Sequence, residues 1–200
     1  MSLSRRRRLA LLLALLATAC SAGGSGRPWQ PSAVVERGVL ARSPSAPAGS
    51  RTAYVVRVVD GDTLVADLPG RPAVRVRLVG VDSPESVKPN SPVACFGPVA
   101  SAYAKQLLTG VTVRVAAEPG AQTDRYGREL WDVWMPDGRF VAGLLVADGL
   151  GRAYPFPPQV QFAPFLQTVQ AEARAAGRGL WGPPCHGRSF STPDRAWPAP

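Results

Sequence analysis

The stretch VDGDTLVADLPGRPAVRVRLVGVDSPE, residues 59–85, has carboxylates at both ends, arginines between them, and mostly β-branched or aliphatic residues elsewhere. Three apolar runs cover residues 54–59, 63–68 and 74–81, the first of which begins just before this stretch. The turn signals Asp60-Gly61 and Pro69-Gly70 separate them. In the third run, apolar residues alternate with Arg75 and Arg77, which is the period of a strand with one wet face. The stretch therefore predicts a three-stranded meander.

The rest of the chain predicts two more strands and three helices. The strands cover residues 111–116 and 130–135, and a loop rich in Pro, Ser and Asn covers residues 81–96. Helical spacing follows Pro98 as far as Gly110, and recurs over residues 141–148 and 162–176. The predicted fold class is α+β, a five-stranded OB-type β-barrel with three helices. Such barrels commonly bind oligonucleotides or oligosaccharides.

The N-terminus is typical of an export signal at residues 1–20. Arg5–Arg8 precede a short apolar run, and small residues precede Cys20. The run is too short for a permanent transmembrane helix. The pattern predicts a lipoprotein signal with lipidation at Cys20, and so an extracellular or membrane-anchored protein. An ordinary secretory signal and a twin-arginine route remain open.

Composition then divides the mature chain. Residues 21–50, rich in Gly, Ser, Pro and Ala, predict a flexible tether, and residues 183–200 predict a Pro-rich tail. Residues 51–182 are left as one domain, long enough to bury a core and expected to be monomeric.

The net charge and the cysteines indicate what kind of partner the protein binds and in which redox compartment it works. The formal net charge is +9, and it becomes +5 when the four arginines of the signal, which has no acidic residue, are removed. A basic domain suits a polyanion. In an exported chain, Cys95 and Cys185 are expected to form a disulfide, with two free thiols as the alternative. The only histidine is His186, which disfavours zinc and a Ser-His-Asp triad.

The remaining chemistry rests on carboxylates and arginines. Asp62 and Asp82 stand at the ends of neighbouring predicted strands, where a meander can bring them together. Two converging carboxylates repel, and a hard cation such as Ca²⁺ resolves the conflict. The Ser83 carbonyl is a further candidate ligand, and Glu85 is a candidate to hold or deprotonate a metal-bound water.

Arginines are the natural partners of a phosphate at such a site. Arg77 precedes Asp82 by one strand length, and TDRYGRE, residues 123–129, adds Arg125, Tyr126 and Arg128. Arginines on both sides of a phosphate would neutralise the charge that develops during phosphoryl transfer. Taken singly, each feature could also be an ordinary hairpin turn, a solvated loop or a wet strand face.

Together these segments resemble the motif blocks of the thermonuclease, or staphylococcal-nuclease-like, family. The resemblance rests on DGDT, RLVGVDSPE, CFGPVASAYAKQLL, TDRYGRELW and AEARAAGRGLW, which begin at residues 60, 77, 95, 123 and 171. It implies an OB-type barrel and Ca²⁺-dependent cleavage of DNA and RNA, single-stranded or in a breathing duplex, to products ending in 3′-phosphate.

The resemblance also implies roles for individual residues. Asp62, Asp82 and Ser83 would bind calcium, and Arg77 and Arg128 would clamp the scissile phosphate, with Glu85 against the attacking water. Tyr126, with Arg125 beside it, and Tyr154 would contact the nucleotide. The segment around Tyr154 is one residue shorter than the family pattern, and the loop 86–94 contains a single lysine, Lys88.

Two other functions remain as alternatives to a nuclease. One is a non-catalytic nucleic-acid-binding OB module on the cell surface, which would bind in a salt-dependent way without forming products. The other is a carbohydrate-binding or structural lipoprotein with no affinity for polynucleotides. The complete carboxylate set favours catalysis, because binding alone has no need of Asp62 and Glu85.

Overall fold

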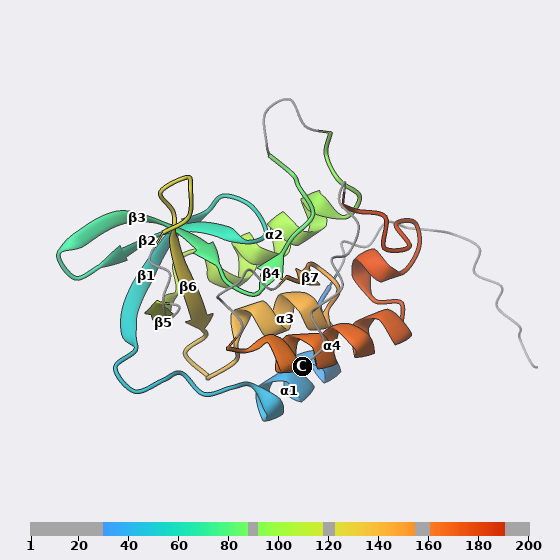
Figure 1. Cartoon of the computed structure of the whole chain (residues 1–200), viewed down its shortest axis with the longest axis horizontal. Coiled ribbons are helices and arrows are strands. Elements are labelled where there is room, and N and C mark those ends of the chain that lie inside the picture. The colour runs from blue at the N-terminus through green and yellow to red at the C-terminus, as the bar shows by residue number, and fades with distance from the viewer. Residues whose placement is uncertain (1–29, 88–91, 118–122, 155–160, 191–200) are drawn as a thin grey trace, which may run out of the picture.

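The computed structural model describes residues 30–87, 92–117, 123–154 and 161–190 (Figure 1). Cys20, and with it the predicted signal and lipidation site, lies outside these residues. Within them, no helix is both long enough and apolar enough to cross a membrane.

The predicted five-stranded barrel is confirmed, and it closes in the order β1-β2-β3-β6-β5. Neighbouring strands are antiparallel except β3 and β6, which run parallel. The alternation predicted in the third strand holds, because Val76 and Leu78 are buried in the core while Arg75 is exposed. The strands are β1 (Arg51–Val58), β2 (Thr63–Leu68), β3 (Arg71–Leu78), β5 (Thr112–Ala117) and β6 (Glu129–Trp134).

The three predicted helices are α2 (Gly97–Leu108), α3 (Val141–Ala147) and α4 (Ala163–Ala175), followed by a 3₁₀ turn, η1 (Gly179–Trp181). Every residue of α3 is buried, because this helix packs between β6 and the helices α1 (Ala33–Arg42) and α4. Figure 1 shows the barrel on one side of the molecule and these stacked helices on the other.

A second, two-stranded sheet was not predicted. It pairs β4 (Val81–Asp82) with β7 (Arg152–Ala153), so that Asp82 lies opposite Arg152. Two-residue strands have no detectable period, and this pairing joins segments 70 residues apart, which is why sequence patterns miss it. The sheet connects the end of the meander to the chain that follows α3.

The prediction of a flexible tether over residues 21–50 is corrected where the structure describes it. Residues 33–42 form helix α1 (Ala33–Arg42), begun by Ser32, whose Oγ accepts the N–H of Val35. Val39 is only 1% exposed, and Arg42 forms an ion pair with Glu172 of α4. The sequence signal was weak because α1 has no broad apolar face, and tertiary contacts rather than amphipathicity hold it.

The chain after α1 also belongs to the fold. Phe140 donates its N–H to Ser43 Oγ at 3.0 Å, and the indole of Trp134 donates to the Pro44 carbonyl at 2.7 Å. Aromatic contacts among Trp134, Phe140 and Phe162, at centroid distances of 5.1 to 5.8 Å, close this end of the barrel. The folded unit therefore begins well before the predicted boundary at residue 51.

The predicted C-terminal boundary at residue 182 also needs correction. The expected disulfide joins Cys95 to Cys185 with a Cα–Cα distance of 5.7 Å, and Cys185 is 2% exposed. Ser189 is buried, and Phe190 packs on the buried guanidinium of Arg152. Residues 183–190 are thus part of the folded unit rather than a loose tail.

A buried aspartate lies where α1 meets α3. Asp148 follows α3 directly, is 2% exposed, and accepts a hydrogen bond from the backbone of Ser32. Burial, reinforced by the charge of Glu36, raises the pKa of Asp148 from 3.8 to about 7, and the Ser32 hydrogen bond and the charge of Arg178 only partly oppose this rise. Tyr103, whose hydroxyl donates to Glu36, also lies within electrostatic range of Asp148.

We expect this aspartate to make stability depend on pH. Between its unfolded pKa of 3.8 and its folded pKa of about 7, the folded protein keeps a proton that the unfolded chain has lost. The free energy of unfolding therefore falls as pH rises through that window. Asp148→Asn cannot ionise, and should stabilise the protein at pH 8 by about 2–4 kcal/mol, with little effect at pH 4.

Thermal denaturation of wild type and variant at both pH values measures this difference. Asp137→Asn is the matched control, because the Asp137 side chain is 48% exposed in a surface turn. Equal shifts of the melting temperature at pH 4 and pH 8 would contradict the assignment.

Candidate functional site

The site begins at the turn between β1 and β2. Asp62 is 6% exposed, and its Oδ2 accepts hydrogen bonds from Ser83 N at 2.7 Å and Ser83 Oγ at 3.0 Å. Gly61 permits this approach, because a Cβ at that position would lie 2.6 Å from both Cβ and Oγ of Ser83. The β1–β2 turn and the segment after β4 are therefore locked together at Asp62.

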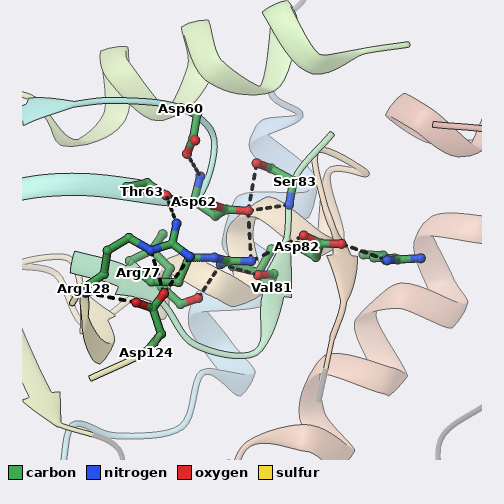
Figure 2. Close-up of polar contacts among 11 residues, drawn as sticks. Asp60, Asp62, Thr63, Arg77, Val81, Asp82, Ser83, Asp124 and Arg128 are labelled. Atoms are coloured by element: carbon green, nitrogen blue, oxygen red, sulfur yellow. Dashed lines mark hydrogen bonds and ion pairs between the residues drawn. The ribbon is translucent and has the colours of Figure 1, made fainter. Parts of the chain in front are cut away.

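Arg77 occupies the space between the two predicted metal ligands. Its Nη2 lies 3.2 Å from Asp62 Oδ2 and 3.4 Å from Asp82 Oδ1 (Figure 2). Its Nη1 donates to the carbonyls of Leu78 and Val81, each at 2.7 Å. The structure thus brings Asp62 and Asp82 to one point, as the meander predicts, and holds Arg77 there from four directions.

Negative charge is in excess around this arginine. Asp60 Oδ1 accepts the N–H of Asp62, and burial together with the charge of Asp62 raises the pKa of Asp60 to about 6. The pKa of Asp82 is also raised, mainly by burial, although Arg77 and Arg152 act to lower it. Carboxylates whose ionisation is opposed in this way favour the arrival of additional positive charge.

Arg128 reaches the same place from the connection between β5 and β6. Its Nε donates to Asp124 Oδ2 at 2.7 Å, and its Nη1 donates to Thr63 Oγ1 at 3.1 Å. Thr63 Oγ1 in turn donates to Asp62 Oδ1 at 3.2 Å. Arg77 and Arg128 therefore contact opposite ends of the Asp62–Thr63 pair, as Figure 2 shows.

Sequence reasoning did not single out Asp124, which orients this arginine. Asp124 Oδ1 also accepts the N–H groups of Tyr126 and Arg128. Burial acts to raise the pKa of Asp124, but these hydrogen bonds and the charge of Arg128 outweigh it and lower the pKa. An aspartate immediately before Arg-Tyr-Gly-Arg was the signal available, since Asp side chains commonly cap such turns.

The predicted substrate-contacting residues lie on two segments. Tyr126 is 57% exposed, with Arg125 4.8 Å and Arg128 5.3 Å from its ring centroid. Tyr154 follows β7, donates its N–H to the Gly80 carbonyl, and has the guanidinium of Arg152 at 5.2 Å. Tyr126 is thus an exposed aromatic side chain with two guanidinium groups over its ring.

Glu85 is held by its own loop. Its Oε1 accepts the N–H groups of Ser86 and Val87, each at 2.9 Å, and its carbonyl accepts the N–H of Ala94 at 2.8 Å. Glu85 follows Asp82 by three positions in the sequence, and its two side-chain hydrogen bonds set the orientation of its carboxylate.

Arg152 is the second functional residue that sequence reasoning missed. It is 4% exposed, and its Nε and Nη2 lie 3.0 and 2.9 Å from Asp82 Oδ2. No local pattern marks it, because its partner is 70 positions earlier and meets it only through the β4–β7 pairing.

The next question is whether the oxygen atoms of this site are suited to bind a metal ion. Among the described residues, no group of three or more His, Cys, Asp and Glu side chains could hold one. Two carboxylates, Asp62 and Asp82, do converge with surplus negative charge beside Ser83. Such a site fits a hard cation that accepts carbonyl and water oxygens as its remaining ligands, and does not fit zinc.

The sequence is similar to those of known nucleases. Residues 75–183 match the family model described as staphylococcal nuclease homologue. The chain is 41% identical over 127 residues to a thermonuclease of Staphylococcus intermedius, covering 64% of this chain and 74% of that protein. It is 37% identical over 134 residues to a thermonuclease of Staphylococcus hyicus, covering 67% and 78%.

A third relative is an uncharacterized endonuclease of Escherichia coli O157:H7. The identity is 40% over 127 residues, covering 64% of this chain and 74% of that protein.

Proposed function

We propose that this chain, which belongs to the staphylococcal nuclease homologue family, is a Ca²⁺-dependent nuclease that hydrolyses phosphodiester bonds in DNA and RNA. The observation that carries the proposal is the convergence of Asp62 and Asp82 on Arg77, with Arg128 at the other side of Thr63. Its relatives named as thermonucleases and an endonuclease support the nuclease class.

Arg77 and Arg128 are assigned to the scissile phosphate. Their side chains are 16% and 20% exposed, so each is anchored by carboxylates and still open to a ligand. Guanidinium groups match phosphate oxygens with paired donors. Because the carboxylates orient both groups in advance, little reorganisation is needed when negative charge develops on the phosphate.

Asp62, Asp82 and the Ser83 carbonyl would hold the calcium ion, with water completing the ligand set. Calcium supplies Lewis-acid stabilisation and makes a bound water easier to deprotonate. Glu85 is the carboxylate assigned to the attacking water, since its loop fixes it three residues beyond Asp82. Arg125, Tyr126 and Tyr154 are assigned to nucleotide contacts outside the clamp.

We also propose that the mature protein is exported and attached to the cell membrane through a lipid on Cys20. The support is the arginine-rich, apolar and small-residue order of residues 1–19. Residues 21–32 separate Cys20 from α1, and their Gly, Ser and Pro content is typical of a linker.

Calcium-dependent hydrolysis is the first predicted result. The full chain should degrade denatured DNA and RNA in millimolar Ca²⁺, and activity should disappear in excess EGTA and return when Ca²⁺ is restored. Product formation is followed on labelled oligonucleotides. Activity unchanged by EGTA would exclude the calcium assignment, and salt-dependent binding without products would favour the non-catalytic module.

Removal of one phosphate clamp should affect rate far more than fold. Arg128→Ala is expected to lower turnover by about 10³-fold, the scale of one charge clamp on a phosphoryl transition state. Arg114→Ala is the control, because Arg114 is an exposed β5 arginine that donates to Ser50 Oγ. Kinetics and thermal melts on both variants measure the effect, and turnover equal to wild type would remove Arg128 from the mechanism.

Lipidation predicts the mass of the mature N-terminus. Expressed with its own leader in a bacterial host, the protein should begin at Cys20 and carry the mass of attached acyl chains. Cys20→Ser should abolish both features. An unacylated start at another residue in the wild type, found by mass spectrometry, would end this proposal.

A further inference from the structure

Arg152 binds the carboxylate oxygen of Asp82 that does not face Arg77. Asp82 Oδ1 faces Arg77 Nη2 at 3.4 Å, while Asp82 Oδ2 receives Arg152 Nε at 3.0 Å and Nη2 at 2.9 Å. The two oxygens are therefore assigned to different arginines. As long as Arg152 keeps Oδ2, the carboxylate cannot rotate its Oδ1 away from Asp62 and Arg77.

Arg152 is itself held by aromatic rings. Its side chain is 5% exposed, and its guanidinium lies 4.1 Å from the ring centroid of Phe190 and 5.2 Å from that of Tyr154. An arginine enclosed between a carboxylate and ring faces has few alternative positions. Phe190 thus supports Asp82 through one intermediate side chain.

Phe190 lies in the segment that the disulfide attaches to the rest of the domain. Between Gly182 and Phe190 the chain makes a compact turn, in which Gly187 N donates to the Leu180 carbonyl at 2.7 Å and Arg188 N to the Cys185 carbonyl at 2.9 Å. Cys185, at the centre of this turn, is bonded to Cys95.

The other half of the disulfide lies beside the Glu85 loop. Ala94, next to Cys95, donates its N–H to the Glu85 carbonyl at 2.8 Å. A Cβ on Gly97 would lie 2.5 Å from the same carbonyl, so the two segments are in close contact. One covalent bond therefore joins the segment that supports Asp82 to the segment that supports Glu85.

We propose that Arg152 is a positioning residue for Asp82, and that the disulfide-bonded segment 183–190 keeps it in place through Phe190, so that activity requires the bond between Cys95 and Cys185. This inference rests on the nuclease function proposed above. A dithiol that reduces the bond converts Cys95 and Cys185 to two thiols and is itself oxidised to a disulfide. Segment 183–190 then keeps only its non-covalent contacts, so Phe190 holds Arg152 less firmly and Asp82 loses its fixed orientation.

The experiment uses the full chain and changes one support at a time. Phe190→Ala removes the ring and keeps the disulfide, Phe190→Tyr keeps the ring, and Cys95→Ser with Cys185→Ser removes the bond. Arg174→Ala is the matched control, because the Arg174–Trp181 pair has a similar distance, 4.2 Å, and is not part of the contacts to Asp82. Calorimetry gives the Ca²⁺ dissociation constant, steady-state kinetics on denatured DNA give kcat and KM, and circular dichroism gives the melting temperature.

Loss of a residue that orients a metal ligand typically costs about 10- to 100-fold in affinity or rate. We expect that loss, mainly in kcat and Ca²⁺ affinity, for Phe190→Ala and for the double serine variant, measured well below their melting temperatures. Phe190→Tyr and Arg174→Ala should stay within about twofold of wild type, and dithiothreitol should weaken wild type but not the double variant further.

Phe190→Ala decides the outcome if the double variant fails to fold. Wild-type Ca²⁺ affinity and kcat in a folded Phe190→Ala would overturn the inference while leaving the nuclease proposal intact. A wild-type chain without calcium-dependent hydrolysis would instead overturn the proposed function. Equal losses in Phe190→Ala and Arg174→Ala would reduce the role of Phe190 to general stability.

Discussion

The arrangement of this protein depends on the cost of bringing acidic groups together in a partly buried place. Asp62 and Asp82 approach one another, and Asp60 is hydrogen-bonded to the backbone of Asp62. All three lie in a partly buried place where ionised carboxylates are poorly solvated. Arg77 makes this possible, and backbone carbonyls from two further positions hold the arginine itself. The carboxylates and guanidinium groups of the site therefore depend on one another, because removing an arginine would leave the aspartates around it to repel each other.

Barrel closure brings the second guanidinium to the same point. The parallel pairing of β3 with β6 places Arg77 beside Leu130, so the chain just before β6 passes the site with Arg128 on it. Asp124 and Thr63 then orient that arginine. A rigid sheet suits the proposed phosphate clamp, because small displacements of charged groups would weaken their action on a phosphate.

Segments outside the barrel act on the site through packing. Helix α1 covers α3 at one end of the molecule, where Asp148 is buried against it. Residues 183–190 place Phe190 against Arg152, which contacts Asp82. Both segments lie in stretches predicted to be a tether or a tail, and both are ordered because apolar, ionic or covalent contacts with the domain offset the entropy of fixing them.

The sequence by itself determined the barrel strands, three of the four α-helices in the described part of the chain, the convergence of Asp62 with Asp82, and the pairing of Cys95 with Cys185. Strict alternation, turn residues and the number of cysteines are local or countable signals, so they survive without coordinates. Only the tertiary structure decided the contacts of Arg152, Phe190 and α1, and the β4–β7 pairing that carries Arg152. Each of these depends on a contact between distant segments, and a contact of that kind leaves no period or motif in the chain that makes it.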